Sequence, residues 1–242
     1  MKTATLTGTL QLPADRTALH SSRYVATAAI AALPFVLAII GLQSGFSGHD
    51  AWYSEEDGLA ENLQVVFLLL GSIAAVMVAR RRGRDGERLL PLLYVGLAIA
   101  LFFVAGEEIS WGQRLLGIET PPEIAATNVQ HELNVHNSFL LTPVFSLAQL
   151  VLGGGIMLAA LVPWGAFLPE RLDALRQALV PGPALAPYFG MSAAWRLYRY
   201  DFLHPGTPAW VGEMSEVPEL ILYLGLCLFT LDQVRRVRRT HH

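Results

Sequence analysis

The sequence predicts an all-α fold, a polytopic transmembrane helical bundle of about six spans with both termini in the cytoplasm. Composition is the first reason: 53% of the 242 residues are hydrophobic and 15% are charged, against about 25% charged in soluble domains. The second reason is that four long runs carry no charge, at 25–47, 63–79, 89–106 and 138–169. About 20 apolar residues are enough for a helix to cross the hydrocarbon core of a bilayer.

The spans are predicted within a single transmembrane domain, residues 24–234. In order they cover 24–46, 58–80, 89–110, 138–163, 183–200 and 216–234. The polar tail 1–23 is too long and too mixed for the charged start of a cleaved signal peptide, so we expect the first span to be retained. Two prolines and two arginines interrupt the fifth span, which makes its crossing of the membrane the open point.

The arginines predict the orientation of the bundle. The runs at 80–88 ("RRRGRDGER") and in the basic tail 235–242 flank spans on one side, and positively charged loops stay in the cytoplasm. An amphipathic stretch at about 168–180 predicts an interfacial helix on the same side. The other connecting segments, 47–58, 106–138 and 200–219, each carry a net charge of −4. We therefore expect an inner (cytoplasmic) membrane protein whose acidic segments face the periplasm or cell exterior, without a nucleic-acid partner on that side.

The first acidic segment, "YSEEDGLAEN" at 53–62, mixes helix capping with one unusual residue. Ser54 and the three acids at 55–57 fit an N-cap and the first turn of a helix. Glu61 lies a full turn into the span, where a carboxylate needs a partner or a wet cavity. Glu61 is therefore a candidate catalytic base.

The second segment, "GEEISWGQR" at 106–114, places two acids at the C-terminal end of a span. The helix dipole opposes Glu107 and Glu108 there, and acids inside membranes are candidate functional sites. The alternative is an ion pair with Arg114 or with the arginines of the fifth span. If the helix continues, Glu107, Trp111 and Arg114 share one face. Trp111 is then either an interfacial anchor or a substrate contact.

The third segment, "TNVQHELNVHN" at 127–137, is predicted to be a helix that runs into the fourth span. In such a helix Glu132 and His136 share one face, Asn134 and Asn137 lie on another, and His131 points elsewhere. Glu-x-x-x-His on a helix can present two metal ligands, or a base with its orienting acid. The alternative is a histidine hydrogen-bonded at the membrane surface.

The fourth segment, 195–219, contains two arginines on the side that positive charge disfavours. Arg196 and Arg199 share a helix face, where they either neutralise the acids or bind an anionic head group. The tryptophans and tyrosines of this segment are typical of an interfacial belt. Glu216 and Glu219 suit the capping of the last span and are lesser candidates.

The runs "GEEISWGQR" and "NVQHELNVHN", preceded by "EEDGLAEN", resemble stretches in a group of bacterial multi-pass membrane proteins of unknown function. The resemblance covers residues 50–145 and implies no activity. A weaker resemblance is to the alkaline ceramidase-like membrane hydrolases, which place an acid- and Asn-rich segment ahead of a span beside a zinc site. This chain lacks their His-x-x-x-His pair, so that likeness is an analogy only.

Taken together, the four segments predict a polar vestibule that opens outward. A divalent metal would be held by Glu108, Glu132 and His136, with His131 as a further candidate ligand. Zinc is favoured by the imidazole ligands, and calcium or magnesium would be favoured by carboxylates alone. The catalytic candidates are Glu107, Glu108, Glu61 and His136. The substrate-binding candidates are Arg196, Arg199, Trp111, Arg114, Asn134 and Asn137.

Three functions are compatible with such a site. The first is a metal-dependent hydrolase or transferase that acts on a lipid-like substrate at the outer leaflet. The second is a proton- or cation-coupled carrier, which is disfavoured because the spans hold few polar residues at mid-depth. The third is a non-catalytic membrane subunit that docks a partner through its outer face.

Overall fold

The computed structural model describes residues 14–55, 58–128, 130–164, 169–202 and 207–239. Within these ranges the chain forms helices joined by turns, with one isolated β-bridge between Asn128 and Ser138. The predicted all-α class is confirmed. Five helices are long and apolar enough to cross a membrane: Tyr24–Ser47, Leu59–Arg84, Leu89–Glu108, Thr142–Leu161 and Ala209–Arg239.

Six long helices build the bundle. They are α1 (Ala14–Ser47), α3 (Leu59–Arg84), α4 (Leu89–Glu108), α7 (Thr142–Leu161), α9 (Ala186–Phe202) and α11 (Glu216–Arg239). Helix α9 corresponds to the predicted fifth span, but its 17 residues include charged side chains, and it is not among the five helices that are long and apolar enough to cross a membrane. The short helices are α2 (Ala51–Ser54), α5 (Gln113–Leu116), α6 (Pro122–Ala125), α8 (Glu170–Leu179) and α10 (Ala209–Glu213).

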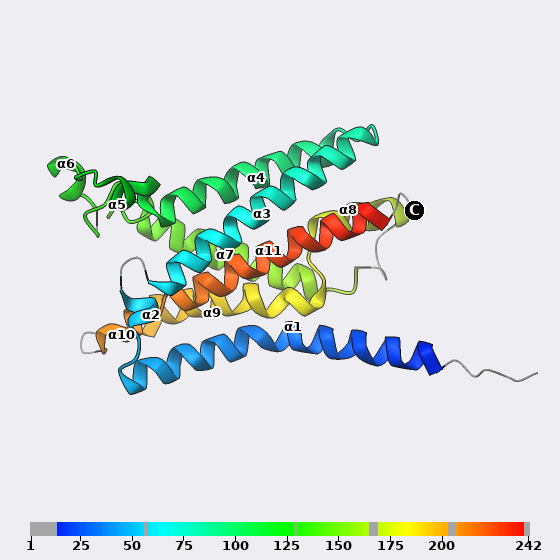
Figure 1. The fold of residues 1–242 in the computed structure, drawn as a ribbon, viewed down its shortest axis with the longest axis horizontal. Coiled ribbons are helices and arrows are strands. Elements are labelled where there is room, and N and C mark those ends of the chain that lie inside the picture. Colours follow the sequence, from blue (N-terminus) through cyan, green and yellow to red (C-terminus); the bar gives the residue numbers. More distant parts are fainter. Residues whose placement is uncertain (1–13, 56–57, 129, 165–168, 203–206, 240–242) are drawn as a thin grey trace, which may run out of the picture.

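Helix α11 lies at the centre of the bundle (Figure 1). It packs against α3 on one side and α9 on the other, while α4 packs on α3, α7 packs on α9, and α1 lies along α9 and α11. The contact with α9 depends on Gly225, because a Cβ there would lie 2.6 Å from the Cβ of Tyr188. The largest group of buried apolar residues follows α11, with Val217 and Ile221 fully buried.

The two ends of the bundle differ in charge. The start of α1, the turn between α3 and α4, and the end of α11 lie together at one end (Figure 1). We call this the basic end, because the last turns of α3 and α11 carry arginines there. The opposite end, which carries α2, α5, α6 and α10, we call the acidic end. Arginines at a helix C-terminus also interact favourably with its dipole.

Several helices begin or end at residues other than those predicted. Helix α1 begins at Ala14 rather than after the predicted tail 1–23, and α11 continues to Arg239, through much of the predicted tail 235–242. The remaining tail residues, 1–13 and 240–242, lie outside the described ranges. The predicted amphipathic helix at 168–180 is α8, apart from residue 168, which is not described.

Helix α8 is tied to the basic end of the bundle. The hydroxyl of Tyr94 donates to the carbonyl of Ala178 at 2.5 Å, and the Gln233 amide donates to the carbonyl of Gln177 at 2.9 Å. Within α8, Arg176 Nε donates to the Asp173 carboxylate at 2.7 Å. This hydrogen bond holds the pKa of Asp173 below its usual value.

Candidate functional site

The end of α4 separates two adjacent acids. The helix ends at Glu108 and the chain turns away through Ser110, Trp111 and Gly112, whose φ angles are 45°, 56° and 77°. The helix ends two residues before the predicted end of the span at 110, so the condition for Glu107, Trp111 and Arg114 to share one face is not met. The Arg114 side chain lies outside the described part of the structure. Successive residues of a helix point about 100° apart. Glu107 and Glu108 accordingly face different groups of side chains.

Glu107 fixes the loop that follows the span. Its Oε1 accepts a hydrogen bond from the indole of Trp111 at 2.7 Å. Its Oε2 accepts from the backbone N–H groups of Val135 at 2.6 Å and His136 at 2.9 Å, and His136 Nδ1 lies 3.5 Å away. The Glu107 side chain is 3% exposed. These contacts join the end of α4 to Trp111 and to segment 127–138.

Segment 127–138 is not the helix that its capping pattern predicts. Asn128 Oδ1 accepts from the backbone N–H groups of Gln130 and Glu132, at 2.9 and 3.2 Å. Its amide donates to the backbone and side-chain oxygens of Asn134, at 2.9 and 2.8 Å. These bonds use groups that a helix would need, and asparagine commonly competes with helices in this way. Glu132 and His136 therefore do not share a helix face.

A second set of bonds ties this segment to the turn after α4. Ser110 Oγ donates to Glu132 Oε2, and the Asn134 amide donates to both, at 3.0 Å each. Gln113 Oε1 accepts from the backbone N–H of Leu133 at 2.6 Å. We call the connected residues the loop network, and they are Glu107, Ser110, Asn128, Glu132 and Asn134. All five are buried, and their contacts are those of a structural cap on the acidic end.

Two other candidates of this segment have local contacts. His131 is exposed, has a φ of 59°, and its Nδ1 lies 2.7 Å from the carbonyl of Ala125. The Asn137 amide donates to the side-chain oxygen of Gln130. Both residues shape the loop, and neither reaches Glu108 in the described contacts.

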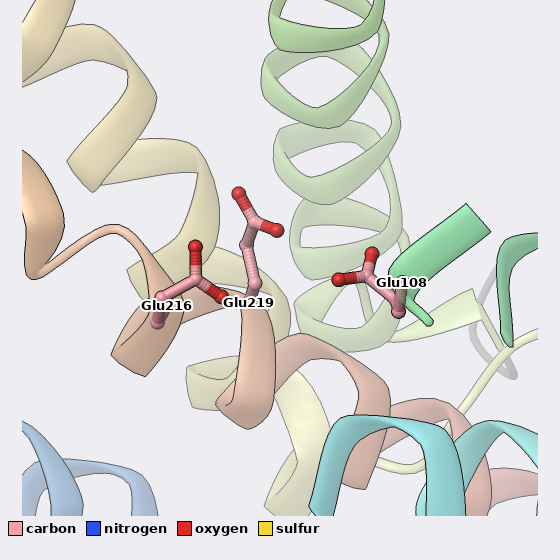
Figure 2. A group of neighbouring side chains, drawn as sticks. All are labelled: Glu108, Glu216 and Glu219. Atoms are coloured by element: carbon pink, nitrogen blue, oxygen red, sulfur yellow. The ribbon is translucent and has the colours of Figure 1, made fainter. Parts of the chain in front are cut away.

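The second polar group lies between α4 and α11. Glu108, Glu216 and Glu219 each offer a carboxylate oxygen within 4.8 Å of the others. We call these three residues the carboxylate cluster. Figure 2 shows Glu216 and Glu219 on the first turn of α11 and Glu108 across from them, with its carboxylate directed toward Glu219. The N-terminal dipole of α11 favours negative charge at this position.

Helix α3 contributes a buried amide and a fourth acid to the surroundings. The Gln64 amide donates to Glu216 Oε2 at 2.9 Å and to the Glu216 carbonyl at 3.0 Å. Gln64 is fully buried, and its Oε1 has no hydrogen-bond partner among the residues that the structure describes. Glu61 lies near enough to act electrostatically on Glu108 and Glu216. On α11, the Tyr223 hydroxyl donates to Glu108 Oε1 at 2.9 Å.

Helix α9 supplies the positive charge. Arg196 donates through Nε to Gln149 Oε1 of α7, and through a terminal nitrogen to Glu219 Oε1 of α11. Arg199, one turn further along, donates to Ser215 Oγ at 2.6 Å. Arg196 therefore pairs with an acid, which is one of the two roles predicted for these arginines.

Most of the predicted site residues therefore fall into two groups. Glu108 belongs to the carboxylate cluster, Arg196 bonds to its Glu219, and Glu61 acts on it electrostatically, with Arg199 one turn from Arg196. Glu107, Trp111, Glu132, Asn134 and His136 belong to the loop network or contact it. The predicted metal set of Glu108, Glu132 and His136 is not formed. Among the described residues, the carboxylate cluster is the one group of three acidic, histidine or cysteine side chains that could hold a metal ion.

The residues of α11 that form the site are harder to identify from the sequence. Capping is a sufficient explanation for Glu216 and Glu219, and Tyr223 has no neighbouring motif. Their spacing of three and four residues places all three on one face of an apolar helix. That pattern is a detectable signal. Gln64 and Gln149, polar residues within apolar runs, belong to the same surroundings.

Comparison of the chain with protein-family models, with curated proteins and with solved structures gives no match. The functional assignment consequently rests on the geometry of the two polar groups.

Proposed function

We propose that this protein is a membrane enzyme, a divalent-metal-dependent hydrolase or transferase that acts on a lipid-like substrate with an anionic head group. The observation that carries the proposal is the convergence of Glu108, Glu216 and Glu219 within 4.8 Å. The three side chains are partly buried, and holding like charges together away from bulk water is costly unless a cation or protons neutralise them. Hard divalent cations are held in proteins by such oxygen ligands.

Charge around the cluster favours a divalent ion. Glu61 and the three clustered glutamates bring four negative charges when ionised, and Arg196 and Arg199 bring two positive ones. A divalent cation balances the remainder. Because His136 contacts the loop network instead, the ligand set contains no imidazole and favours magnesium or calcium over the zinc that the sequence suggested.

The buried Oε1 of Gln64, which has no hydrogen-bond partner among the described residues, supports a ligand at the carboxylate cluster. A buried acceptor without a partner is uncommon in folded proteins. The Gln64 amide nitrogen contacts Glu216, so Oε1 of the same amide lies beside the cluster. A bound cation with its water shell would bring the missing donor.

The chain's own residues have assignable roles. Arg196 already bridges α7 and α11 and is placed to hold an anionic head group through a further guanidinium N–H. Glu61 serves as the general base, because it approaches the cluster without being one of the three ligands. A bound metal would polarise the scissile group. Glu107 has a structural role, since its oxygens are occupied by Trp111 and the backbone.

The proposed location follows from the arginines. Basic loops are retained in the cytoplasm, so the basic end would face the cytoplasm and the carboxylate cluster the outer leaflet. With α9 as a sixth span, both termini are cytoplasmic. We infer a bacterial inner membrane from the motif resemblance at residues 50–145.

Turnover of a defined lipid tests the proposal. Purified full-length protein in phosphatidylcholine nanodiscs would be given phosphatidic acid, with magnesium or calcium, and the release of inorganic phosphate measured. Release that requires the divalent ion, and that falls by about 10²-fold or more in Glu108→Gln, supports the enzyme. Glu213→Gln, an exposed acid of α10, is the matched control. No divalent-dependent change in any of several anionic lipids would contradict the proposal.

A cation- or proton-coupled carrier is the second candidate. It is favoured by the extension of polar contacts into the spans, because Gln64 and Gln149 both bond to charged residues of the site. Uptake of calcium or protons into protein-containing vesicles, driven by an ion gradient and lost in Glu108→Gln, would distinguish it from an enzyme.

A further inference from the structure

An apolar cavity lies between α4, α7, α8, α9 and α11, further toward the basic end than the carboxylate cluster. Its volume is about 190 Å³ and its lining is almost entirely aliphatic and aromatic. The hydroxyl of Tyr94 is the polar exception, and it is already bonded to the Ala178 carbonyl. Cavities with such linings stay dry and accept apolar ligands.

On each of three helices, one face carries both a polar residue of the site and a residue that lines this cavity. The pairs are Gln149 and Ile156 on α7, Arg196 and Phe189 on α9, and Glu219 and Leu226 on α11. In each pair the residues are seven positions apart, which is two helical turns and about 10 Å along the axis. The polar group lies nearer the acidic end in each case.

Helix α4 repeats the arrangement. Glu108 and the cavity residues Leu97 and Tyr94 are separated by 11 and 14 positions, close to whole numbers of helical turns. All four helices thus present polar atoms near the acidic end and apolar surface deeper on the same side. This is the pattern that an elongated amphiphile would contact.

The cavity reaches the surface of the bundle at two apolar side chains. Leu93 and Leu179 line it and are also 42% and 41% exposed. Helix α4 packs on α3 and α7 packs on α9, so α4 and α7 flank the cavity from opposite arms of the bundle. An apolar chain would therefore enter beside Leu93 of α4 and Leu179 of α8, where the lining of the cavity is exposed.

We propose that this cavity holds the apolar chain of the membrane lipid whose anionic head group lies at the carboxylate cluster. The inference rests on the proposed function for the position of the head group. The occupant is a chain of a bilayer lipid, because the cavity is apolar, reaches exposed leucines of α4 and α8, and lies on the same helix faces as the cluster. The volume accommodates part of a chain, being below the roughly 300 Å³ of the smaller drug-sized pockets.

Photocrosslinking locates the chain. Full-length protein in phosphatidylcholine nanodiscs would receive phosphatidic acid with a diazirine near the middle of one acyl chain. After irradiation, adducts would be mapped by mass spectrometry. We expect adducts on Leu97 and Ile156, competed by unlabelled phosphatidic acid and not by added phosphatidylcholine. Adducts spread over the lipid-facing side chains Ile99 and Leu158 would overturn the inference.

A bulky side chain in the cavity provides the matched variants. Ile156→Trp should reduce the competed adducts on Leu97 by about tenfold, since overpacking on this scale costs an order of magnitude or more in affinity. Leu158→Trp, on the same helix but 60% exposed, should leave them unchanged. Equal adduct yields in the two variants would contradict the assignment.

The two proposals fail separately. If the protein binds no metal and turns over no lipid, yet adducts remain sensitive to Ile156→Trp, the enzyme is excluded and the cavity is still a lipid site. If turnover is observed but Ile156→Trp leaves both turnover and crosslinking unchanged, the chain lies elsewhere and only the proposed function stands.

Discussion

Glu107 and Glu108 are adjacent in the chain and belong to different structures. Glu107 is enclosed by the Trp111 indole and two backbone N–H groups, while Glu108 lies with Glu216, Glu219 and Tyr223. The 100° step between neighbouring helical residues produces the separation. One acid thereby anchors the loop network, and the other remains available to a ligand.

Matched glutamine variants should separate these roles. Glu107→Gln replaces an acceptor oxygen by an NH₂ group that faces a donor, so we expect a loss of about 1–3 kcal/mol in the free energy of unfolding. Glu108→Gln removes a negative charge from a crowded carboxylate group and should leave stability unchanged or raise it. Thermal unfolding of both proteins in the same detergent, without added metal, measures the difference. An equal loss in both variants would contradict the assignment.

For single residues, the sequence identifies which acids are unusual better than it identifies the residues that contact them. The position of Glu108 at the negative end of a helix dipole correctly marks it as a residue that capping does not explain. Its partners come from α11, about 110 residues later in the chain, and nothing local in the sequence connects them. Glu216 and Glu219 also satisfy a capping pattern, so the simpler explanation concealed their position in the cluster.

Among the helices, the contact between α9 and α11 places Arg196 opposite Glu219. This contact requires the two helices to approach closely at Gly225, where the side chain of Tyr188 packs against the α11 backbone. Tyr188 is fully buried and its hydroxyl donates to the Ile30 carbonyl of α1 at 2.8 Å. Three helices are therefore held together at one level, two turns below the carboxylate cluster.

Alanine at two glycines should have opposite effects. Gly225→Ala places a methyl group 2.6 Å from Tyr188 Cβ, and the enforced shift should lower the free energy of unfolding by about 1–3 kcal/mol. Gly155→Ala, on α7, meets nothing within 4 Å and should be neutral or stabilising by up to about 1 kcal/mol, because alanine favours helix. Unfolding midpoints in detergent measure both, and a stable Gly225→Ala protein would show that α9 and α11 are not closely packed.

The apolar helices are predictable because hydropathy over some 20 residues reports directly on their environment. Segment 127–138 is the opposite case. Thr127 and Gln130 give a capping pattern, yet Asn128 bonds to Asn134 and to two backbone N–H groups, and Glu107 takes up two more from another element. Those tertiary bonds outweigh a local helix signal, and their distant member, Glu107, cannot be identified from the segment itself.

The whole molecule is a helical bundle with one basic and one acidic end. Five helices are long and apolar enough to cross a membrane and correspond to predicted spans, while α9 is shorter and carries Arg196 and Arg199. Hydropathy alone therefore does not determine whether α9 crosses the membrane as a sixth span. The side on which each end lies depends on the arginines and is testable.

Cysteine labelling tests the proposed topology. Cys227 is the only cysteine and is buried, so Cys227→Ser gives a background for single replacements. On intact cells, an impermeant maleimide should label His49→Cys and Ala209→Cys, and should label Asp85→Cys and Gly182→Cys only after permeabilisation. Labelling of positions 182 and 209 from the same side would show that α9 does not cross the membrane.

The metal content of the purified protein tests the central claim most directly. After equilibration with magnesium, calcium and zinc and removal of free ions, elemental analysis would compare the parent with Glu108→Gln, Glu219→Gln and the control Glu213→Gln. The account predicts near-stoichiometric magnesium or calcium in the parent and the control, and its loss in both cluster variants while the proteins stay folded. No bound ion in the parent, or the same content in all four proteins, would contradict a metal site at the carboxylate cluster.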